Sequence, residues 1–242
     1  MRILIVIPAF NEEQALGGLL DEIREVKIAG ASIDVVVVDD GSTDRTSSVT
    51  RDHDVRLLRM FNNLGIGGAV QAGLKLAQRE GFDYAVQIDG DGQHPPAEIE
   101  RLLAAAANHD LVVGTRFTDE KTFRSTLMRR LGSKWLRTIL RVVGVRISDP
   151  TSGLRLYGRR ALRLFSETYP YDFPEPESLS VARAAGLSLA ETSVKMRERQ
   201  GGRSSILGFA PLYYMFKVTL AIALSYMRAP RRLPNEEPWN QK

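Results

Sequence analysis

Two aspartates separated by one glycine, Asp89 and Asp91, are the residues of this sequence best placed to do chemistry. Carboxylates at positions i and i+2 of a turn can both reach one hard cation, and a glycine between them lets the backbone approach closely. Gln93 can add an amide oxygen and His94 an imidazole nitrogen. A polar turn with solvated aspartates is the alternative. The apolar run 84–88 before the turn favours the cation site, because it predicts a buried strand that ends there.

Two further polar clusters also follow apolar runs. Residues 3–7 precede Pro8, Asn11 and Glu12, and residues 33–38 precede Asp39 and Asp40. The carboxyl ends of parallel strands meet at one edge of a sheet, so the three clusters are predicted to converge on one crevice. There Asp39 and Asp40 can support a metal site, bind the metal, or accept hydrogen bonds from the base and ribose of a nucleotide. Helix capping by residues 40–44 is the alternative.

The elements that position these clusters are predicted from the spacing of apolar residues. Strands are expected over residues 3–7, 33–38, 56–60, 84–88, 111–114 and 188–196, and helices over residues 15–23, up to residue 50, 69–79 and 97–107. Alternation of strand and helix predicts an α/β protein with a mostly parallel sheet flanked by helices. The basic segment 124–146 is expected to continue the same domain.

The stretch 206–227 is apolar apart from a few residues and is close to the ~20 residues that span a bilayer. Lys217 in its middle disfavours insertion by about 2.5–3.5 kcal/mol, so we expect a helix at the membrane interface, or one buried against the domain or a partner. The expected organisation is one domain over 1–205, divided into 1–115 and 116–205. An apolar or amphipathic helix over 206–232 and a flexible tail over 233–242 follow.

A glycine-rich segment and a basic helix are candidate phosphate binders. Gly65 opens a segment resembling part of the dinucleotide fingerprint, but Val70 stands where the last glycine or alanine would be, so a nicotinamide cofactor is not expected. Its backbone N–H groups can still bind a diphosphate, and close helix packing is the alternative. Arg129 and Ser133 are four residues apart and share a helix face, where they can hold one phosphate.

Composition excludes several classes of function. The 242 residues include 33 Lys and Arg against 29 Asp and Glu, a net charge of +4 that suits an anionic ligand. Without cysteine there is no disulfide, no thiolate zinc site and no cysteine nucleophile. Dispersed basic residues and few aromatic ones argue against nucleic acid as a partner. The first apolar run is too short for a signal peptide, so the start of the chain is expected to stay in the cytosol.

Taken in order, five motifs resemble glycosyltransferase family 2, specifically its branch of dolichyl-phosphate mannose synthases and bacterial polyprenyl-phosphate glycosyltransferases. They are VIPAFNEE (6–13), VVDDGSTD (37–44), NLGIGGA (63–69), DGDGQHPP (89–96) and DPTSGLR (149–155). The resemblance covers about residues 1–210, and it implies that 1–205 form a catalytic domain with a nucleotide-sugar half over 1–115 and an acceptor half over 116–205. It implies a GT-A fold and an inverting transfer of a hexose or N-acetylhexosamine from GDP-mannose or a UDP-sugar to polyprenyl or dolichyl phosphate. It also implies Mg²⁺ or Mn²⁺ as cofactor.

The resemblance assigns roles by motif. The implied metal ligands are Asp89, Asp91 and Gln93. The nucleotide-sugar residues are Pro8, Asn11, Glu12, Asp39, Asp40, Gly65, Asp89, Arg199 and Arg203, with Ser205 standing where relatives often have lysine. The acceptor-phosphate residues are Arg116, Arg129 and Ser133, and the catalytic residues are Asp91, Asp149 and Arg116.

A phosphate monoester is largely dianionic at neutral pH, since its second pKa is about 6, and it needs little help from a base. Catalysis is therefore expected through positioning and charge neutralisation, with Asp149 orienting an arginine or the sugar. The protein is expected at the cytoplasmic face of the membrane, brought there by its C-terminal helix or by a small membrane-protein partner. The alternatives are a transferase for a polysaccharide or soluble acceptor, and a catalytically silent nucleotide-sugar-binding subunit of a membrane complex.

Overall fold

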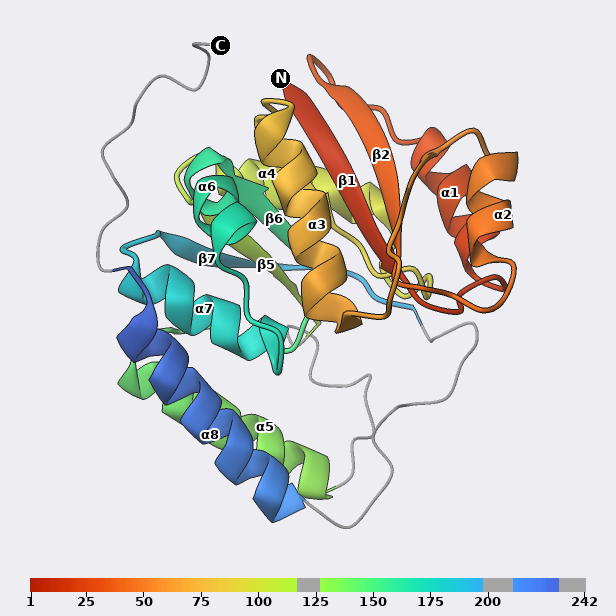
Figure 1. The fold of residues 1–242 in the computed structure, drawn as a ribbon. Helices are drawn as coiled ribbons and strands as arrows, with labels where there is room; N and C mark the ends of the chain where they lie inside the picture. Colours follow the sequence, from red (N-terminus) through yellow and green to blue (C-terminus); the bar gives the residue numbers. More distant parts are fainter. Residues whose placement is uncertain (117–126, 198–210, 231–242) are drawn as a thin grey trace.

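The structure, a computed structural model, describes residues 1–116, 127–197 and 211–230, without the side chains of 127–131 and 211–214. A seven-stranded sheet forms its centre, in the order β3-β2-β1-β4-β6-β5-β7 (Figure 1). The strands are β1 (Arg2–Ala9), β2 (Ser32–Asp39), β3 (Arg56–Arg59), β4 (Tyr84–Gln87), β5 (Leu111–Thr115), β6 (Arg155–Gly158) and β7 (Leu189–Ser193). Only β6 pairs antiparallel with its neighbours, so the prediction of a mostly parallel sheet is confirmed.

The register of the parallel strands brings their carboxyl ends to one edge of the sheet. Ala9 of β1 lies opposite Asp39 of β2, and Val6 of β1 lies opposite Gln87 of β4. β1 is fully apolar between its ends because both faces of the sheet are covered by helices. The segments that follow β1, β2 and β4 therefore leave the sheet side by side.

Helices cover both faces of the sheet and form two separate apolar cores. They are α1 (Leu16–Arg24), α2 (Thr46–Asp52), α3 (Gly65–Arg79), α4 (Ile99–Ala106), α5 (Leu127–Val142), α6 (Arg159–Glu167), α7 (Pro174–Ala184) and α8 (Pro211–Arg228), with a short 3₁₀ turn, η1 (Pro96–Glu98), before α4. One core joins α3, α6 and α7 to one face of the sheet, and the other joins α1 and α4 to the opposite face. β6, α6 and α7 were not predicted.

The C-terminal segment differs from the apolar helix that was expected. Within its described part, α8 lies beside α5 and against α7, away from the sheet (Figure 1). Val218 and Ile222 are buried, whereas Phe216 and Lys217 are exposed. The prediction of an apolar helix is corrected, because polar residues interrupt the segment and only one face is buried against the domain. Across the described residues, no helix is long and apolar enough to cross a membrane.

Candidate active site

The segments that follow β1, β2 and β4 contact one another, as the sequence predicted. The Ile88 N–H donates to the carbonyl of Val6 at 3.0 Å, and the Asp40 N–H donates to that of Ala9 at 2.9 Å. Gly90 lies so close to the end of β1 that a Cβ there would be 3.3 Å from the Pro8 carbonyl oxygen and 3.6 Å from Glu12 Cγ. The polar clusters of these three segments therefore border one site.

Hydrogen bonds join the segment after β1 to the segment after β2. Asn11 adopts a left-handed backbone conformation with φ 57°, its N–H donates to Ser42 Oγ at 3.0 Å, and its Oδ1 accepts from the Thr43 N–H at 2.9 Å. The Glu12 N–H donates to Thr46 Oγ1 at 2.9 Å. Asn11 therefore shapes the rim of the site through these bonds, and direct contact with a nucleotide sugar stays a prediction for it.

Asp39 and Asp40 have different surroundings. Asp39 is fully buried, its Oδ1 accepts from the Ser42 N–H at 2.8 Å, and its Oδ2 accepts from the Ser47 hydroxyl. Both carboxylate oxygens hold the turn and each keeps a further lone pair for a donor, so contact of Asp39 with a nucleoside stays a prediction. Asp40 accepts from the Leu64 N–H at 2.8 Å and fastens the segment that leads into α3. Burial raises the pKa of Asp40, against the opposing effect of these backbone N–H groups.

Close helix packing, one of the two arrangements left open for the glycine-rich segment, is present along α3. Gly65 begins α3 with φ +77°, and a Cβ there would meet open space. Gly73, two turns further along α3, packs so closely on β1 that a Cβ would lie 2.2 Å from Val6 Cγ1. Gly67 also packs closely, since a Cβ there would lie 2.4 Å from the Pro170 carbonyl oxygen. The Gly65 N–H donates to Asn63 Oδ1 at 3.0 Å, so binding of a diphosphate at the start of α3 stays a prediction.

The turn after β4 holds the candidate metal ligands. The side chain of Asp89 is 28% exposed, and the Gln93 N–H donates to Asp91 Oδ1 at 3.1 Å. His94 is buried beneath the turn, with Nδ1 3.5 Å from the Asp89 N and 3.8 Å from its Oδ2. Gln87 Nε2 lies 3.5 Å from Asp89 Oδ1. His94 therefore supports the turn from below and contacts Asp89 by a ring nitrogen.

The segment 149–153 closes the other side of Asp89. A Cβ on Gly153 would lie 2.1 Å from Asp89 Oδ2, so only glycine allows this approach. Arg116, directly after β5, donates from Nε to Asp149 Oδ2 at 2.7 Å, and Thr151 Oγ1 donates to Asp149 Oδ1 at 3.0 Å. The prediction that Asp149 orients an arginine is confirmed as a contact. Its catalytic role stays a prediction.

Two further charged residues border the site and were not predicted. Arg155 is fully buried and donates to the carbonyls of Ser152 at 2.8 Å and Glu175 at 2.9 Å, which ties segment 149–153 to the start of α7. The carboxyl of Glu175 has a raised pKa, chiefly through burial, with Arg155 lowering it and the charge of Asp89 raising it. The sequence signal was present, since Arg155 ends the DPTSGLR motif, but the contact depends on tertiary structure.

The acceptor-phosphate residues are only partly described. Ser133 lies on α5, and its carbonyl accepts from Arg137 Nε at 3.3 Å. Arg129 belongs to the same helix, but its side chain lies outside the described residues, as do Arg199, Arg203 and Ser205 entirely. Their roles stay predictions.

The oxygen donors of the turn fit a hard divalent cation. Asp89 is partly exposed, and Gly153 leaves room for its carboxylate. In the described part of the chain, no group of three or more His, Cys, Asp or Glu residues could hold a metal ion. A site made of two carboxylates and the Gln93 amide suits Mg²⁺ or Mn²⁺ that is also bound by substrate phosphates and water.

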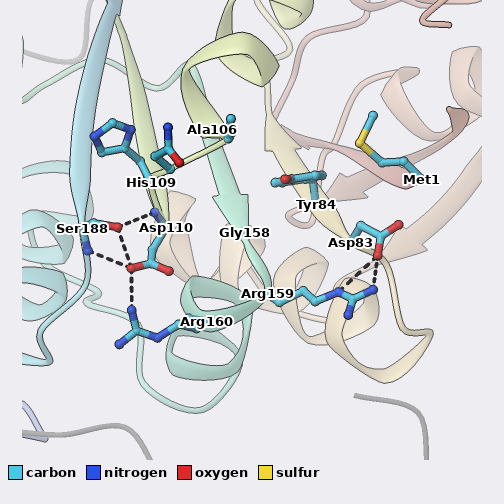
Figure 2. A pocket seen from close by; sticks show the side chains of 12 residues that line it. Met1, Asp83, Tyr84, Ala106, His109, Asp110, Gly158, Arg159, Arg160 and Ser188 are labelled. Carbon is cyan, nitrogen blue, oxygen red and sulfur yellow. Dashed lines mark hydrogen bonds and ion pairs between the residues drawn. The ribbon is translucent and has the colours of Figure 1, made fainter. Parts of the chain in front are cut away.

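A separate hollow of about 630 Å³ lies among the start of β4, the end of α4 and the start of α6 (Figure 2). Arg159 forms an ion pair with Asp83, and Arg160 Nη1 pairs with Asp110 at 2.8 Å. Ser188 donates to the same Asp110 carboxylate from both its N–H and its hydroxyl. Because these charges neutralise one another, the hollow is better explained by packing than by a bound ion.

The sheet and the site define the GT-A class of nucleotide-sugar transferases. Glucosyl-3-phosphoglycerate synthase from Mycobacterium tuberculosis, crystallised with Mn²⁺, UDP and glucosyl-3-phosphoglycerate, has a TM-score of 0.69 at 21% identity, covering 95% of this chain and 81% of that chain. The sequence model of glycosyl transferase family 2 matches residues 4–165. The chain belongs to glycosyltransferase family 2.

Relatives within the family are similar over most of their length. Undecaprenyl-phosphate mannosyltransferase of Micrococcus luteus is 32% identical, over 86% of this chain and 88% of that protein. Polyprenol monophosphomannose synthase of Mycolicibacterium smegmatis is 33% identical, over 90% of this chain and 85% of that protein. Both names describe transfer to a polyprenyl phosphate.

Proposed function

We propose that this protein is an inverting glycosyltransferase that moves a hexose or N-acetylhexosamine from a nucleotide sugar to polyprenyl or dolichyl phosphate. The observation that carries the proposal is that Asp89 lies between the end of β1 and segment 149–153, whose Asp149 holds Arg116. This arrangement supports a cation site at the acids and binding of a phosphate by the arginine. The polyprenyl-phosphate relatives support the choice of acceptor.

The donor is proposed to be GDP-mannose or a UDP-sugar, bound along the carboxyl edge between Pro8, Glu12 and the start of α3. Asp89, Asp91 and Gln93 would hold Mg²⁺ or Mn²⁺, which supplies charge neutralisation of the diphosphate leaving group when bound. The N-terminus of α3, which begins at Gly65, is proposed as a second source of positive potential for that diphosphate.

The protein's own part in the reaction is to hold and orient the donor and the acceptor. An oxygen of the acceptor phosphate forms the new bond to the anomeric carbon while the bond to the nucleoside diphosphate breaks on the opposite side, which inverts the configuration. The phosphate is already largely dianionic, so no residue has to remove a proton. Arg116, fixed by Asp149, binds the acceptor phosphate, and Arg129 and Ser133 are proposed to join it.

We propose that the α5–α8 face brings the active site to the cytoplasmic face of an anionic membrane. Phe216 and Leu220, four residues apart on α8, are 68% and 47% exposed, and Trp135 on α5 is 46% exposed. Lys217, between them in the sequence, and Arg228, at the end of the helix, are also exposed, and a mixture of apolar and cationic side chains favours an anionic interface. A small membrane-protein partner remains the other means of reaching the lipid.

The test is a transfer assay with purified protein, labelled GDP-mannose and labelled UDP-sugars, Mn²⁺ or Mg²⁺, and undecaprenyl phosphate. The proposal expects labelled lipid with one donor, lost in Asp91→Ala. Label on a polysaccharide but not on lipid supports the alternative acceptor. Donor binding by calorimetry without transfer or hydrolysis supports the silent subunit and contradicts the proposal.

A further inference from the structure

A chain of buried polar groups leads from the core to Asp89. Tyr157 is fully buried, and Tyr169 and Gln87 are 4% and 1% exposed. The Tyr157 hydroxyl donates to Gln87 Oε1 at 2.9 Å and lies 3.2 Å from the Tyr169 hydroxyl. Gln87 Nε2 donates in turn to Asp89 Oδ1 at 3.5 Å. The chain ends on the carboxylate that is proposed to hold the cation.

Apolar residues surround this chain. Tyr157 and Tyr169 both pack edge-on against Phe165, with ring centroids 5.8 and 5.3 Å apart, and both belong to the core between the sheet and α3, α6 and α7. A buried polar group without a partner destabilises the fold, so polar groups in an apolar core call for an explanation. Phenylalanine and leucine would fill the same space without needing partners. The explanation that the geometry offers is the link to Asp89.

The hydrogen bonds of the chain have one direction. Because Oε1 of Gln87 accepts the Tyr157 hydroxyl, the Nε2 end of the amide must face Asp89 as a donor. Burial raises the pKa of Tyr157 and raises that of Tyr169 well above its usual value, so both hydroxyls stay protonated at neutral pH. Aligned donors in a low-dielectric core strengthen one another.

The fold fixes both ends of the chain. Gln87 is the last residue of β4, and Tyr157 of β6 lies opposite Ala85 in the same ladder. Asp89 has Gly153 and His94 Nδ1 near Oδ2, and the Gln87 amide against Oδ1. The rotation of the carboxylate is therefore constrained from two sides by residues that a substrate does not reach.

We propose that Gln87 and Tyr157 are positioning residues that hold the carboxylate of Asp89 in the orientation needed to bind a divalent cation. The inference rests on the proposed function, since it concerns the same cation. Groups behind a metal ligand change metal affinity typically 10- to 100-fold when they are removed. Neither residue touches substrate, so both act through Asp89 alone.

The test titrates Mn²⁺ alone into the full-length protein and follows free Mn²⁺ by electron paramagnetic resonance. Gln87→Met, which keeps the volume and removes the amide, is expected to weaken Mn²⁺ binding about 10-fold or more. Tyr157→Phe, which removes one hydroxyl, is expected to weaken it between about 2- and 10-fold. Thermal unfolding followed by circular dichroism checks that each variant is folded.

Tyr169→Phe is the matched control. It removes a similarly buried hydroxyl from the same series of hydrogen-bonded groups and leaves the bond from Tyr157 to Gln87 in place. Its Mn²⁺ affinity should stay within about 2-fold of wild type, although its stability falls like that of Tyr157→Phe. If the wild type binds Mn²⁺ and both Gln87→Met and Tyr157→Phe bind it equally well, the inference is overturned and the proposed function stands. Failure of the wild type to bind Mn²⁺ contradicts the metal site itself, and the inference with it.

Discussion

Asp149 shows how one residue's surroundings limit the role it can take. Its side chain is 1% exposed, and its two oxygens accept from Arg116 and Thr151. A general base needs a free oxygen directed at the proton it removes, whereas this carboxylate is already engaged on both sides. The proposed acceptor, a largely dianionic phosphate, would make such a base unnecessary. Asp149 is therefore best understood as the residue that aims Arg116.

Replacing Asp149 by asparagine should lower turnover about tenfold, because Arg116 then donates to a neutral amide oxygen in place of a carboxylate. Donor binding and thermal stability should change little, since asparagine keeps the shape and its amide N–H can donate to the Thr151 hydroxyl, which now donates to the carboxylate. Steady-state transfer rates, calorimetry with the nucleoside diphosphate and a melting curve test this. Complete loss of turnover with binding and fold intact would restore proton removal as the role of Asp149.

At the scale of elements, the sequence predicts the parallel half of the sheet well. β1, β2 and β4 consist largely of apolar residues, and a polar cluster follows each of them. Their shared edge could therefore be inferred from topology alone. β6 was missed because its four residues begin with a charged arginine and pair antiparallel. α7 was missed because prolines mark its first turn, although proline is favoured there.

The same distinction applies to the site. Asp89 and Asp91 follow an apolar run and could be recognised from local sequence, whereas the nearness of Glu175 to Asp89 depends on how α7 packs. The buried contacts of Arg155 likewise join segments that are distant along the chain. Local patterns therefore predict which residues follow each strand, and only the packed structure shows which distant residues contact them.

Two helix glycines offer a matched test of the packing between α3 and β1. Gly73→Ala should destabilise the protein by about 1–3 kcal/mol, because the new methyl group would lie 2.2 Å from Val6 Cγ1. Gly18→Ala in α1 meets nothing within 4 Å and should stabilise it by about 0.5–1 kcal/mol. Urea unfolding measures both free energies. Equal effects of the two substitutions would contradict the close contact of α3 with β1.

At the scale of the whole molecule, ion pairs remote from the active site hold the other end of the sheet together. Asp83, at the hollow of Figure 2, accepts from the Arg2 N–H at 2.7 Å and from the guanidinium of Arg159. Burial raises the pKa of Asp83, but these donors outweigh burial, so the pKa lies below the ordinary value of 3.8. This contact therefore links three elements and makes the stability of the fold depend on pH.

The sign of that dependence follows from the lowered pKa. The stabilisation by Asp83 is fully present above its unfolded-state pKa of about 4 and is lost as the pH falls through its lower folded-state pKa. Asp83→Asn should be less stable than wild type at about pH 5, and the difference should shrink towards about pH 2. Urea unfolding at both pH values measures it. A difference that grows as the pH falls would contradict the assignment.

The α5–α8 face makes a separate prediction about the whole protein. The wild type should float with vesicles of phosphatidylglycerol and phosphatidylcholine, and a variant carrying Phe216→Glu and Leu220→Glu should bind them at least about tenfold less, because two exposed apolar side chains are lost. Phe61→Glu is the control, since Phe61 is equally apolar and fully exposed but follows β3 at the other edge of the sheet. Equal flotation of all three proteins would contradict membrane binding by this face.

The central claim is that the turn after β4 binds a cation that anchors a nucleoside diphosphate. The most direct measurement is calorimetry of UDP and GDP binding, with and without Mn²⁺, to the wild type and to Asp91→Ala. One nucleotide should bind the wild type only weakly without Mn²⁺ and much more tightly with it, and Asp91→Ala should lose this gain while keeping its melting temperature. Binding that is the same in both proteins and indifferent to Mn²⁺ would contradict the claim.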